Sequence, residues 1–482
     1  MSQTQLLRTW LGLAAGPVAA AVVFLAAATT LPAPTRFVAA LAVWMALWWL
    51  AAPLPLAVTA LLPLVLLPLA GGAGVAVVAR RYADPIVFLF LGGFMLGAAS
   101  ERWGLHRRLA YGVIGLVGGD ARRVVLALMV ATGLISMWIS NTATAALMLP
   151  LTLAVLELGR REAPESARRL GAALVLGMAY AASIGGVATL IGTPPTAIFA
   201  GAARTIAGRP VGFAEWLLVG LPIAVALLGF AWWLLVWVLF PVRGTLRGLA
   251  EHVRRERAVL GTWAPAERCV VIVLIATALA WVLREPKAIG GLTMPGLTSL
   301  APGLSDAGIA VIAAAVLVVL PPSLHARRLA LDWGAARRIR WDVLVLFGGG
   351  LALAAAFETS GLAAWLAGRL AGLAGAPAVL VIGAVTLFFV LLTELTSNTA
   401  TAAMAMPLAA ALAPALGAEP LALMAAAALG SAMGFMLPVG TPPNALAYGS
   451  GAVTRGEMAR AGVWLDVVGA VVITVAVWLW AG

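Results

Sequence analysis

One long apolar run carries polar residues at its centre, where a membrane helix tolerates them least. The run extends from Val124 to Leu158, and Ser140-Asn141-Thr142 lies in its middle. A transmembrane helix needs about 20 residues, so the run is too long for one crossing. Arginines flank both ends, which predicts that both ends face the cytoplasm. The run therefore predicts a re-entrant hairpin over residues 121–159, in which two half-length helices meet at a polar tip.

The same sequence occurs again in the second half of the chain. Ser397-Asn398-Thr399 lies in another apolar run, and Asn398 follows Asn141 by 257 positions. Further downstream, the turn Gly192-Thr193-Pro194-Pro195 is matched at an offset of 248 by Gly440-Thr441-Pro442-Pro443. These matches predict an internal repeat, with a second hairpin over residues 376–418.

The composition excludes most soluble classes of protein. Of the 482 residues, 63% are hydrophobic and 10% are charged, which is typical of a polytopic membrane protein. The net charge of +12 is confined to short loops between apolar runs, so nucleic-acid binding is not predicted. A single cysteine, Cys269, excludes an intramolecular disulfide and a cysteine-based metal cluster. The histidines, His106, His252 and His325, fall in basic loop segments, and we interpret them as cytoplasmic surface residues.

The sequence therefore predicts an all-α polytopic membrane protein with two inverted-topology repeats. It should contain about 11 transmembrane helices plus two re-entrant hairpins. The predicted spans are residues 10–30, 37–52, 54–78, 85–100, 170–199, 213–241, 268–283, 306–321, 342–357, 420–446 and 463–481. Each repeat contains an odd number of crossings, so the second copy is inverted, an architecture typical of secondary transporters.

The distribution of basic residues predicts the orientation. With a cytoplasmic N-terminus, 23 of the 31 Lys and Arg residues lie in cytoplasmic segments and eight lie outside. We therefore expect a protein of the cell inner (plasma) membrane with an external C-terminus. Residues 101–118 and 358–374 are amphipathic and are predicted to lie as arms along the membrane surfaces. Residues 242–267 are rich in charge and are interpreted as a solvated cytoplasmic connector.

The two tips combine groups that suit a cation and an anion. Hydroxyl, amide and freed carbonyl oxygens are hard neutral ligands that suit Na⁺. Amide and hydroxyl hydrogens and half-helix N-termini are donors that suit carboxylate or sulfate oxygens. No Lys or Arg lies near either tip in the sequence, so a bound anion needs cations to balance its charge. This predicts cation coupling, by Na⁺ or another hard cation.

The Gly-Thr-Pro-Pro turns fit the same scheme. Proline removes a backbone donor and ends a helix, and glycine allows the backbone to approach a ligand closely. Each turn should break its span and offer carbonyls beside one tip. Glu394 is an acid directly beside a hairpin tip, and either a structural role or a place in the ion pathway fits it. The chain has no metal-protease motif and no nucleophile with an adjacent base, so it is not predicted to be an enzyme.

These motifs resemble those of the divalent anion–sodium symporters, the Na⁺-coupled dicarboxylate, citrate and sulfate carriers. The resemblance rests on Ser136 to Thr144, on Ser397-Asn398-Thr399 and on the paired Gly-Thr-Pro-Pro turns. It implies Na⁺ ligands at Ser136, Ser140, Asn141 and Gly192 in the first site, and at Thr393, Thr396, Asn398 and Gly440 in the second. It implies substrate contacts from Ser140, Asn141, Thr142, Thr193, Ser397, Asn398, Thr399 and Thr441. Two positions depart from the family pattern, Thr196 and Thr396, and both bear on the ion sites or on the substrate preference.

The resemblance also implies a homodimer with two domains in each protomer. The scaffold domain comprises residues 1–118 and 263–374, and the transport domain comprises residues 119–241 and 375–482. A cytoplasmic linker, residues 242–262, joins the halves. The expected function is Na⁺-coupled uptake of C4-dicarboxylates such as succinate, malate or fumarate by an elevator mechanism. A Na⁺-independent dicarboxylate exchanger, or a sulfate or citrate carrier on the same fold, is the alternative, and a channel or arsenite-type permease is a more distant one.

Overall fold

The structure is a computed structural model that describes residues 3–71, 73–162, 164–289, 292–319, 321, 329–370 and 375–481. Within these residues the fold is helical apart from one small antiparallel pair of strands, β1 (Lys287–Ile289) and β2 (Leu292–Met294). The all-helical class is therefore confirmed. His325 lies outside the described residues.

The first half of the chain forms twelve α-helices, and most follow the predicted spans. They are α1 (Gln3–Ala26), α2 (Ala33–Ala51), α3 (Leu56–Thr59), α4 (Leu62–Leu69), α5 (Val75–Tyr82), α6 (Pro85–Arg102), α7 (Leu105–Ile114), α8 (Ala121–Ser136), α9 (Asn141–Glu162), α10 (Ala167–Gly186), α11 (Pro194–Thr205) and α12 (Phe213–Trp233). A π-helical segment, Leu234–Leu239, continues α12.

The second half repeats much of this order. Its helices are α13 (Leu249–Leu260), α14 (Pro265–Val282), α15 (Asp306–Val319), α16 (Trp333–Ala336), α17 (Trp341–Thr359), α18 (Leu362–Leu370), α19 (Ala378–Thr393), α20 (Asn398–Leu412), α21 (Pro420–Ser431), α22 (Pro442–Gly449) and α23 (Arg455–Ala481).

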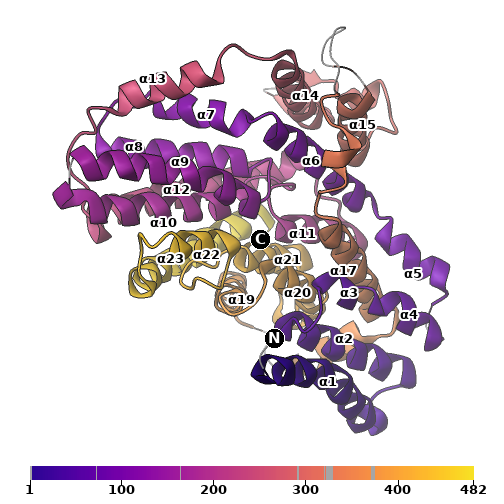
Figure 1. The fold of residues 1–482 in the computed structure, drawn as a ribbon. Helices are drawn as coiled ribbons and strands as arrows, with labels where there is room; N and C mark the ends of the chain where they lie inside the picture. The colour runs from indigo at the N-terminus through magenta and orange to yellow at the C-terminus, as the bar shows by residue number, and fades with distance from the viewer. Residues whose placement is uncertain are drawn as a thin grey trace.

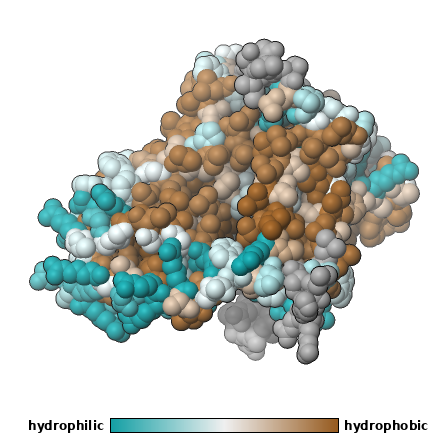
Figure 2. All heavy atoms as spheres, turned by 90° about the horizontal axis from the view of Figure 1, so that it is seen from above, coloured by the Kyte–Doolittle hydropathy of each residue, from teal (hydrophilic) through white to brown (hydrophobic). Residues whose placement is uncertain are grey.

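Many of these helices can cross a membrane. Among the described residues, nine helical segments are long and apolar enough to do so by length and composition, and four shorter apolar helices accompany them. Large apolar side chains such as Leu25, Leu279 and Leu479 are more than half exposed. Figure 2 shows a face dominated by hydrophobic residues, with hydrophilic ones gathered mainly toward one end. An apolar surface of this extent is expected where lipid, rather than water, surrounds the protein.

Each predicted hairpin consists of two helices separated by a four-residue break. In the first, α8 ends at Ser136 and α9 begins at Asn141. In the second, α19 ends at Thr393 and α20 begins at Asn398. The two breaks therefore fall at matching positions, 257 residues apart.

The helices that follow the hairpins pack in the same way in both halves. The helices α8 and α9 pack against α10, and α19 and α20 pack against α21. The halves also interlock, because α22 contacts α9 and α10 while α11 contacts α20 and α21. Figure 1 shows α8, α9, α10 and α12 lying together, with the C-terminal helices α19 to α23 beside them.

Three predictions differ from the structure in detail. The predicted span 54–78 is interrupted: α3 ends at Thr59, α4 ends at Leu69, and residues 75–82 form the separate helix α5. Prolines at positions 63 and 68 and a glycine-rich segment from 71 to 74 explain the interruption. The segment 242–267 is not simply a solvated connector, because its helix α13 docks on α7, with Leu249 and Val253 buried. His106 is not a surface residue, since only 9% of it is exposed.

Candidate functional site

The first tip gathers neutral oxygen atoms in one place. The Ser136 hydroxyl lies 2.6 Å from the Ala182 carbonyl oxygen and 3.0 Å from Asn141 Oδ1. A serine hydroxyl has one hydrogen to donate, so it can satisfy only one of these two acceptors at a time. The three oxygens therefore converge with a single hydrogen among them. Such a cluster is well suited to a hard monovalent cation, which is attracted by all three oxygens.

Two glycines let the backbone close around this cluster. A Cβ atom on Gly186 would collide with Asn141 Oδ1, and one on Gly192 would collide with the Gly186 carbonyl. The Cβ on Gly192 would also lie 2.8 Å from the Ser136 carbonyl oxygen. Only glycine allows so close an approach of three chain segments. The residues therefore fit a compact Na⁺ site composed of Ser136, Asn141 and the backbone around Gly192.

The second tip repeats the arrangement. The Thr393 hydroxyl lies 2.8 Å from Asn398 Oδ1 and 2.8 Å from the Ser431 carbonyl oxygen. Both hydroxyls sit on the last residue of the first hairpin helix, and both amides sit on the first residue of the second. The same local geometry, reached from two different sequences, shows that the tips are structurally equivalent.

Glu394 stands behind the second tip. Its carboxylate is 2% exposed and accepts hydrogen bonds from the backbone N–H groups of Met436, at 2.7 Å, and Leu437, at 2.9 Å. These residues belong to the break between α21 and α22, so Glu394 fastens that break to the hairpin. The equivalent position in the first half is Met137, whose carbonyl oxygen accepts the Thr189 hydroxyl at 2.7 Å. These contacts favour a structural role for Glu394, one of its two interpretations.

The helix ends around the tips supply different groups to a ligand. The helices α9 and α20 begin at the tips with backbone N–H groups that have no partner within the helix and that attract anionic oxygens. One of them, the Ala143 N–H, donates to Ser140 Oγ at 3.4 Å. The helices α11 and α22 begin with Pro194-Pro195 and Pro442-Pro443, which have no N–H to donate. The hairpin helices thus offer backbone N–H donors, whereas the Pro-Pro turns leave backbone carbonyl oxygens as acceptors.

The remaining predicted residues take varied positions. Ser140, Thr142, Asn398 and Thr399 are half-buried and Ser397 is exposed, so a ligand can reach these residues at both tips. Thr193 and Thr441 are buried, at 2% and 3% exposure. The Thr396 hydroxyl turns to Thr401 Oγ1 at 2.6 Å rather than to the Thr393–Asn398 cluster. Among the described residues, no hydrogen bond joins the two tips directly.

A cavity of about 590 Å³ opens at the first tip. Ser140 and Thr142 line one side of it, and Phe94, Gly97 and Ala98 of α6 line another. Its remaining walls include the charged residues Glu101, Arg102, Asp332, Arg338 and Arg340. The second tip does not line this cavity.

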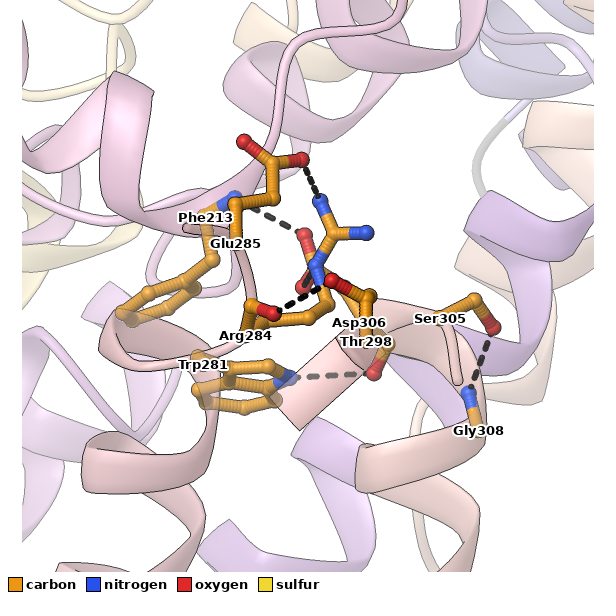
Figure 3. Close-up of polar contacts among 8 residues, drawn as sticks. All are labelled: Phe213, Trp281, Arg284, Glu285, Thr298, Ser305, Asp306 and Gly308. Atoms are coloured by element: carbon orange, nitrogen blue, oxygen red, sulfur yellow. Dashed lines mark hydrogen bonds and ion pairs between the residues drawn. The ribbon is translucent and has the colours of Figure 1, made fainter. Parts of the chain in front are cut away.

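An aromatic stack supports the first tip from the side. Trp138 stacks on Trp281 at a ring-centroid distance of 6.4 Å, and Trp281 stacks on Phe213 at 4.3 Å. Figure 3 shows the polar contacts around two members of this stack, Phe213 and Trp281. Asp306 accepts the Phe213 backbone N–H at 2.9 Å and pairs with Arg284 at 2.6 Å, while its carbonyl accepts the Trp281 indole N–H.

Several supporting residues were not predicted from the sequence. The Thr189 hydroxyl donates to the Met137 carbonyl oxygen and accepts the Gly192 N–H at 3.1 Å. These two bonds fix the segment between α10 and α11 against the first tip. Tyr180 joins the two halves by donating to the Phe435 carbonyl oxygen. Thr196 and Asn444 each tie a Pro-Pro turn to the segment before it: the Thr196 hydroxyl donates to the Leu190 carbonyl oxygen, and the Asn444 amide donates to the Leu437 carbonyl oxygen. The Thr196 departure from the family pattern therefore preserves this contact.

Apolar helices broken in pairs around clusters of neutral oxygens define a membrane transporter for small ions. Comparison with known proteins supports the assignment as a membrane transporter. A family model described as the sodium:sulfate symporter transmembrane region matches residues 7–482. The chain therefore belongs to the divalent anion:Na⁺ symporter family, whose members are transporters rather than enzymes.

Named relatives and one solved structure resemble the chain over most of its length. The sodium-dependent dicarboxylate transporter SdcS of Staphylococcus saprophyticus is 38% identical over 449 residues, which cover 92% of this chain and 85% of that protein. SdcS of Staphylococcus aureus (strain bovine RF122) is 39% identical over 457 residues, which cover 93% and 86%. The YdaH transporter of Alcanivorax borkumensis shares the fold with a TM-score of 0.55 at 18% identity, covering 83% of this chain and 87% of the other.

Proposed function

We propose that this protein is a secondary active transporter that couples Na⁺ to the uptake of C4-dicarboxylates such as succinate, malate or fumarate. The observation that carries the proposal is the pair of neutral oxygen clusters, Ser136 with Asn141 and Thr393 with Asn398. Each cluster suits a Na⁺ ion, and each adjoins a helix N-terminus that suits a carboxylate. The names of the SdcS relatives, sodium-dependent dicarboxylate transporters, agree with this cargo.

The absence of basic residues from the tips explains the coupling. No Lys or Arg occurs in residues 124–159 or in residues 376–418, so neither tip carries a fixed cation of its own. A dianion in such a site carries a large desolvation cost unless cations enter with it. Na⁺ ions held by the two clusters would supply that charge, and the substrate would in turn strengthen Na⁺ binding by linkage.

The test is uptake of radiolabelled succinate into proteoliposomes. An inward Na⁺ gradient should drive accumulation, and choline in place of Na⁺ should abolish it. Unlabelled malate and fumarate should compete, whereas citrate and sulfate should compete weakly. Rapid counterflow of succinate without Na⁺ would instead identify a Na⁺-independent exchanger. Stronger competition by sulfate or citrate would reassign the substrate, and non-saturable flux would indicate a channel.

We further propose that the chain divides into a scaffold, residues 1–118 and 263–374, and a transport domain, residues 119–241 and 375–482. The interlocking of α22 with α9 and of α11 with α20 supports one rigid transport domain that moves as an elevator within a homodimer. Two engineered disulfides in a Cys269→Ser background test this. Cysteines at Gly171 and Ala452 would join the two halves of the transport domain, because a Cβ on Gly171 lies 3.7 Å from the Ala452 Cβ.

The second disulfide would join the scaffold to a hairpin. A Cβ on Gly97 lies 3.7 Å from Ile139 Cγ1, so cysteines at Gly97 and Ile139 can bond. The elevator predicts that the Gly171–Ala452 bridge preserves uptake and that the Gly97–Ile139 bridge blocks it reversibly under reductant. The opposite pattern would show that the hairpins move against each other as gates.

We place the protein in the plasma membrane with a cytoplasmic N-terminus and an external C-terminus, because basic residues concentrate in the segments assigned to the cytoplasm. Leu300 is 88% exposed and Glu165 is exposed, so single cysteines at these positions are accessible to reagents. In the Cys269→Ser background, a membrane-impermeant maleimide should label position 300 from outside and position 165 only from the cytoplasm. The reverse pattern would invert the topology.

A further inference from the structure

The cavity at the first tip has a charged wall on the side away from the hairpin. Three of its lining residues are arginines: Arg102 at the end of α6, and Arg338 and Arg340 between α16 and α17. The three guanidinium groups have different partners in the protein, and these partners determine whether each arginine can still bind an anion.

Two of the three arginines are already neutralised by carboxylates. Arg102 pairs with Asp332 at 2.6 Å, and Arg340 forms a two-pronged pair with Asp342, with its closest contact at 2.8 Å. Arg338 is different, because its Nε donates to the Gly334 carbonyl oxygen at 3.0 Å. No carboxylate among the described residues lies within 4.0 Å of its guanidinium, so its charge is uncompensated by an ion pair.

One acid on the cavity wall is also without an ion pair. Glu101 precedes Arg102 on α6, and no described basic group lies within 4.0 Å of its carboxylate. The wall therefore presents one unpaired cation and one unpaired anion to the space in front of the first tip. An exchange of ligand between the tip and the water outside passes both of them.

We propose that Arg338 forms a vestibular binding subsite for the dicarboxylate dianion, through which the substrate passes between the tip and the water outside the cavity. This proposal rests on the proposed function. Arg338 uses only one of its five N–H donors on Gly334, which leaves the planar fork able to bind a carboxylate with two parallel hydrogen bonds. Glu101 opposes the dianion and keeps the subsite weak, which favours release over trapping.

The subsite raises the concentration of the dianionic substrate near the tip. A cleft lined by apolar walls focuses the field of an unpaired charge and raises the local concentration of the opposite ion. A dianion feels twice the potential of a monoanion, so the effect selects for doubly charged substrates. Because the charges are near solvent, salt screens the attraction over about 8–10 Å.

The experiment measures KM for succinate from each face of the membrane, in right-side-out and inside-out vesicles. Loss of one partly solvated charge in Arg338→Gln should raise KM on the face that bears the cavity about three- to tenfold. KM on the opposite face should stay unchanged. Glu101→Gln should lower KM on the cavity face, and raising the ionic strength should shrink both differences.

Arg337→Gln is the matched control, since Arg337 is exposed on the same segment and does not line the cavity. It should leave KM unchanged on both faces. An unchanged cavity-face KM in Arg338→Gln would overturn the subsite, as would a rise of KM that does not respond to salt. Wild-type protein without saturable succinate transport would overturn the proposed function instead, so the two failures are distinguishable.

Discussion

The Tyr180 hydroxyl, buried within α10, lies 3.2 Å from the Phe435 carbonyl oxygen in the break after α21 and donates to it. The bond ties the first half of the chain to the second, and the two rings meet edge to face at 5.2 Å. It is a direct link between the two broken spans, and it lies within the part of the molecule that we propose moves as one body.

Replacing Tyr180 by Phe should therefore destabilise the protein while keeping the ring packing. Removing the hydroxyl leaves a buried carbonyl with one partner fewer, at a cost of about 1–2 kcal/mol. Thermal unfolding in detergent should show a lower Tm for Tyr180→Phe. Tyr448→Phe is the control, because Tyr448 is 41% exposed, and its Tm should not change. Equal Tm values for Tyr180→Phe and wild type would show that the bond contributes nothing.

Gly192→Ala should weaken Na⁺ binding. The added Cβ would collide with the Gly186 carbonyl and approach the Ser136 carbonyl oxygen, so the first cluster must open. Overpacking of this kind costs about 1–3 kcal/mol, which corresponds to a rise of roughly 5- to 150-fold in the Na⁺ concentration for half-maximal uptake. Gly229→Ala on α12, where nothing lies within 4 Å of the new Cβ, should keep the wild-type value. Identical Na⁺ dependence in both variants would remove Gly192 from the ion site.

Asn141→Ala and Asn398→Ala should each abolish Na⁺-driven uptake, because we propose that each amide oxygen belongs to a cation cluster and that each Asn begins a helix whose N-terminus faces the anion. Loss of a ligand or its direct support typically lowers affinity by about 10–100-fold. Thr152→Ala on α9 removes a polar group bonded only within its own helix, and it should transport normally. All three variants should elute as folded protein in size-exclusion chromatography. Wild-type uptake by either Asn variant would exclude its tip from the mechanism.

His106 should make the protein less stable in acid. Burial, together with the charge of Arg107, lowers the pKa of His106 from 6.5 to about 4. Its neutral form is the native one, so its contribution to stability is full above pH 6.5. Between pH 6.5 and pH 4 the unfolded state binds one proton more than the folded state. The free energy of unfolding therefore decreases as the pH is lowered through this window, by up to about 3 kcal/mol.

His106→Gln removes this titration and should therefore flatten the fall of Tm between pH 7 and pH 5. Gln is neutral at both pH values, and it keeps a polar group in the position where the buried His106 Nδ1 has no hydrogen-bond partner. A Tm fall as large in the variant as in wild type would assign the acid sensitivity to other groups.

The hairpins and their tips could be predicted because the signals are local. A polar triplet in an over-long apolar run, flanked by arginines, constrains the chain without reference to distant residues. The Pro-Pro turns likewise end helices wherever they occur, and α11 and α22 begin at these prolines. The repeat added independent support, since each tip predicted the other.

Contacts between distant segments could not be predicted in this way. Thr189, Tyr180 and His106 acquire their roles from residues far along the chain, and no periodicity marks them. The docking of α13 depends on Glu256, which meets Arg107 and Tyr111 only after folding. Charge density alone suggested a solvated segment there, because a charged helix that pairs with another surface has the same composition as a free one.

If Na⁺ ions at the two tips balance the charge of a bound dianion, the affinity for substrate must depend on the Na⁺ concentration. The most direct test is the Kd of succinate for the purified protein, measured by calorimetry over a range of Na⁺ concentrations with choline keeping ionic strength constant. The Kd of succinate should fall steadily as the Na⁺ concentration rises, with almost no binding in choline alone. Asn398→Ala should flatten this dependence. A succinate Kd that stays constant from zero to saturating Na⁺ would contradict it.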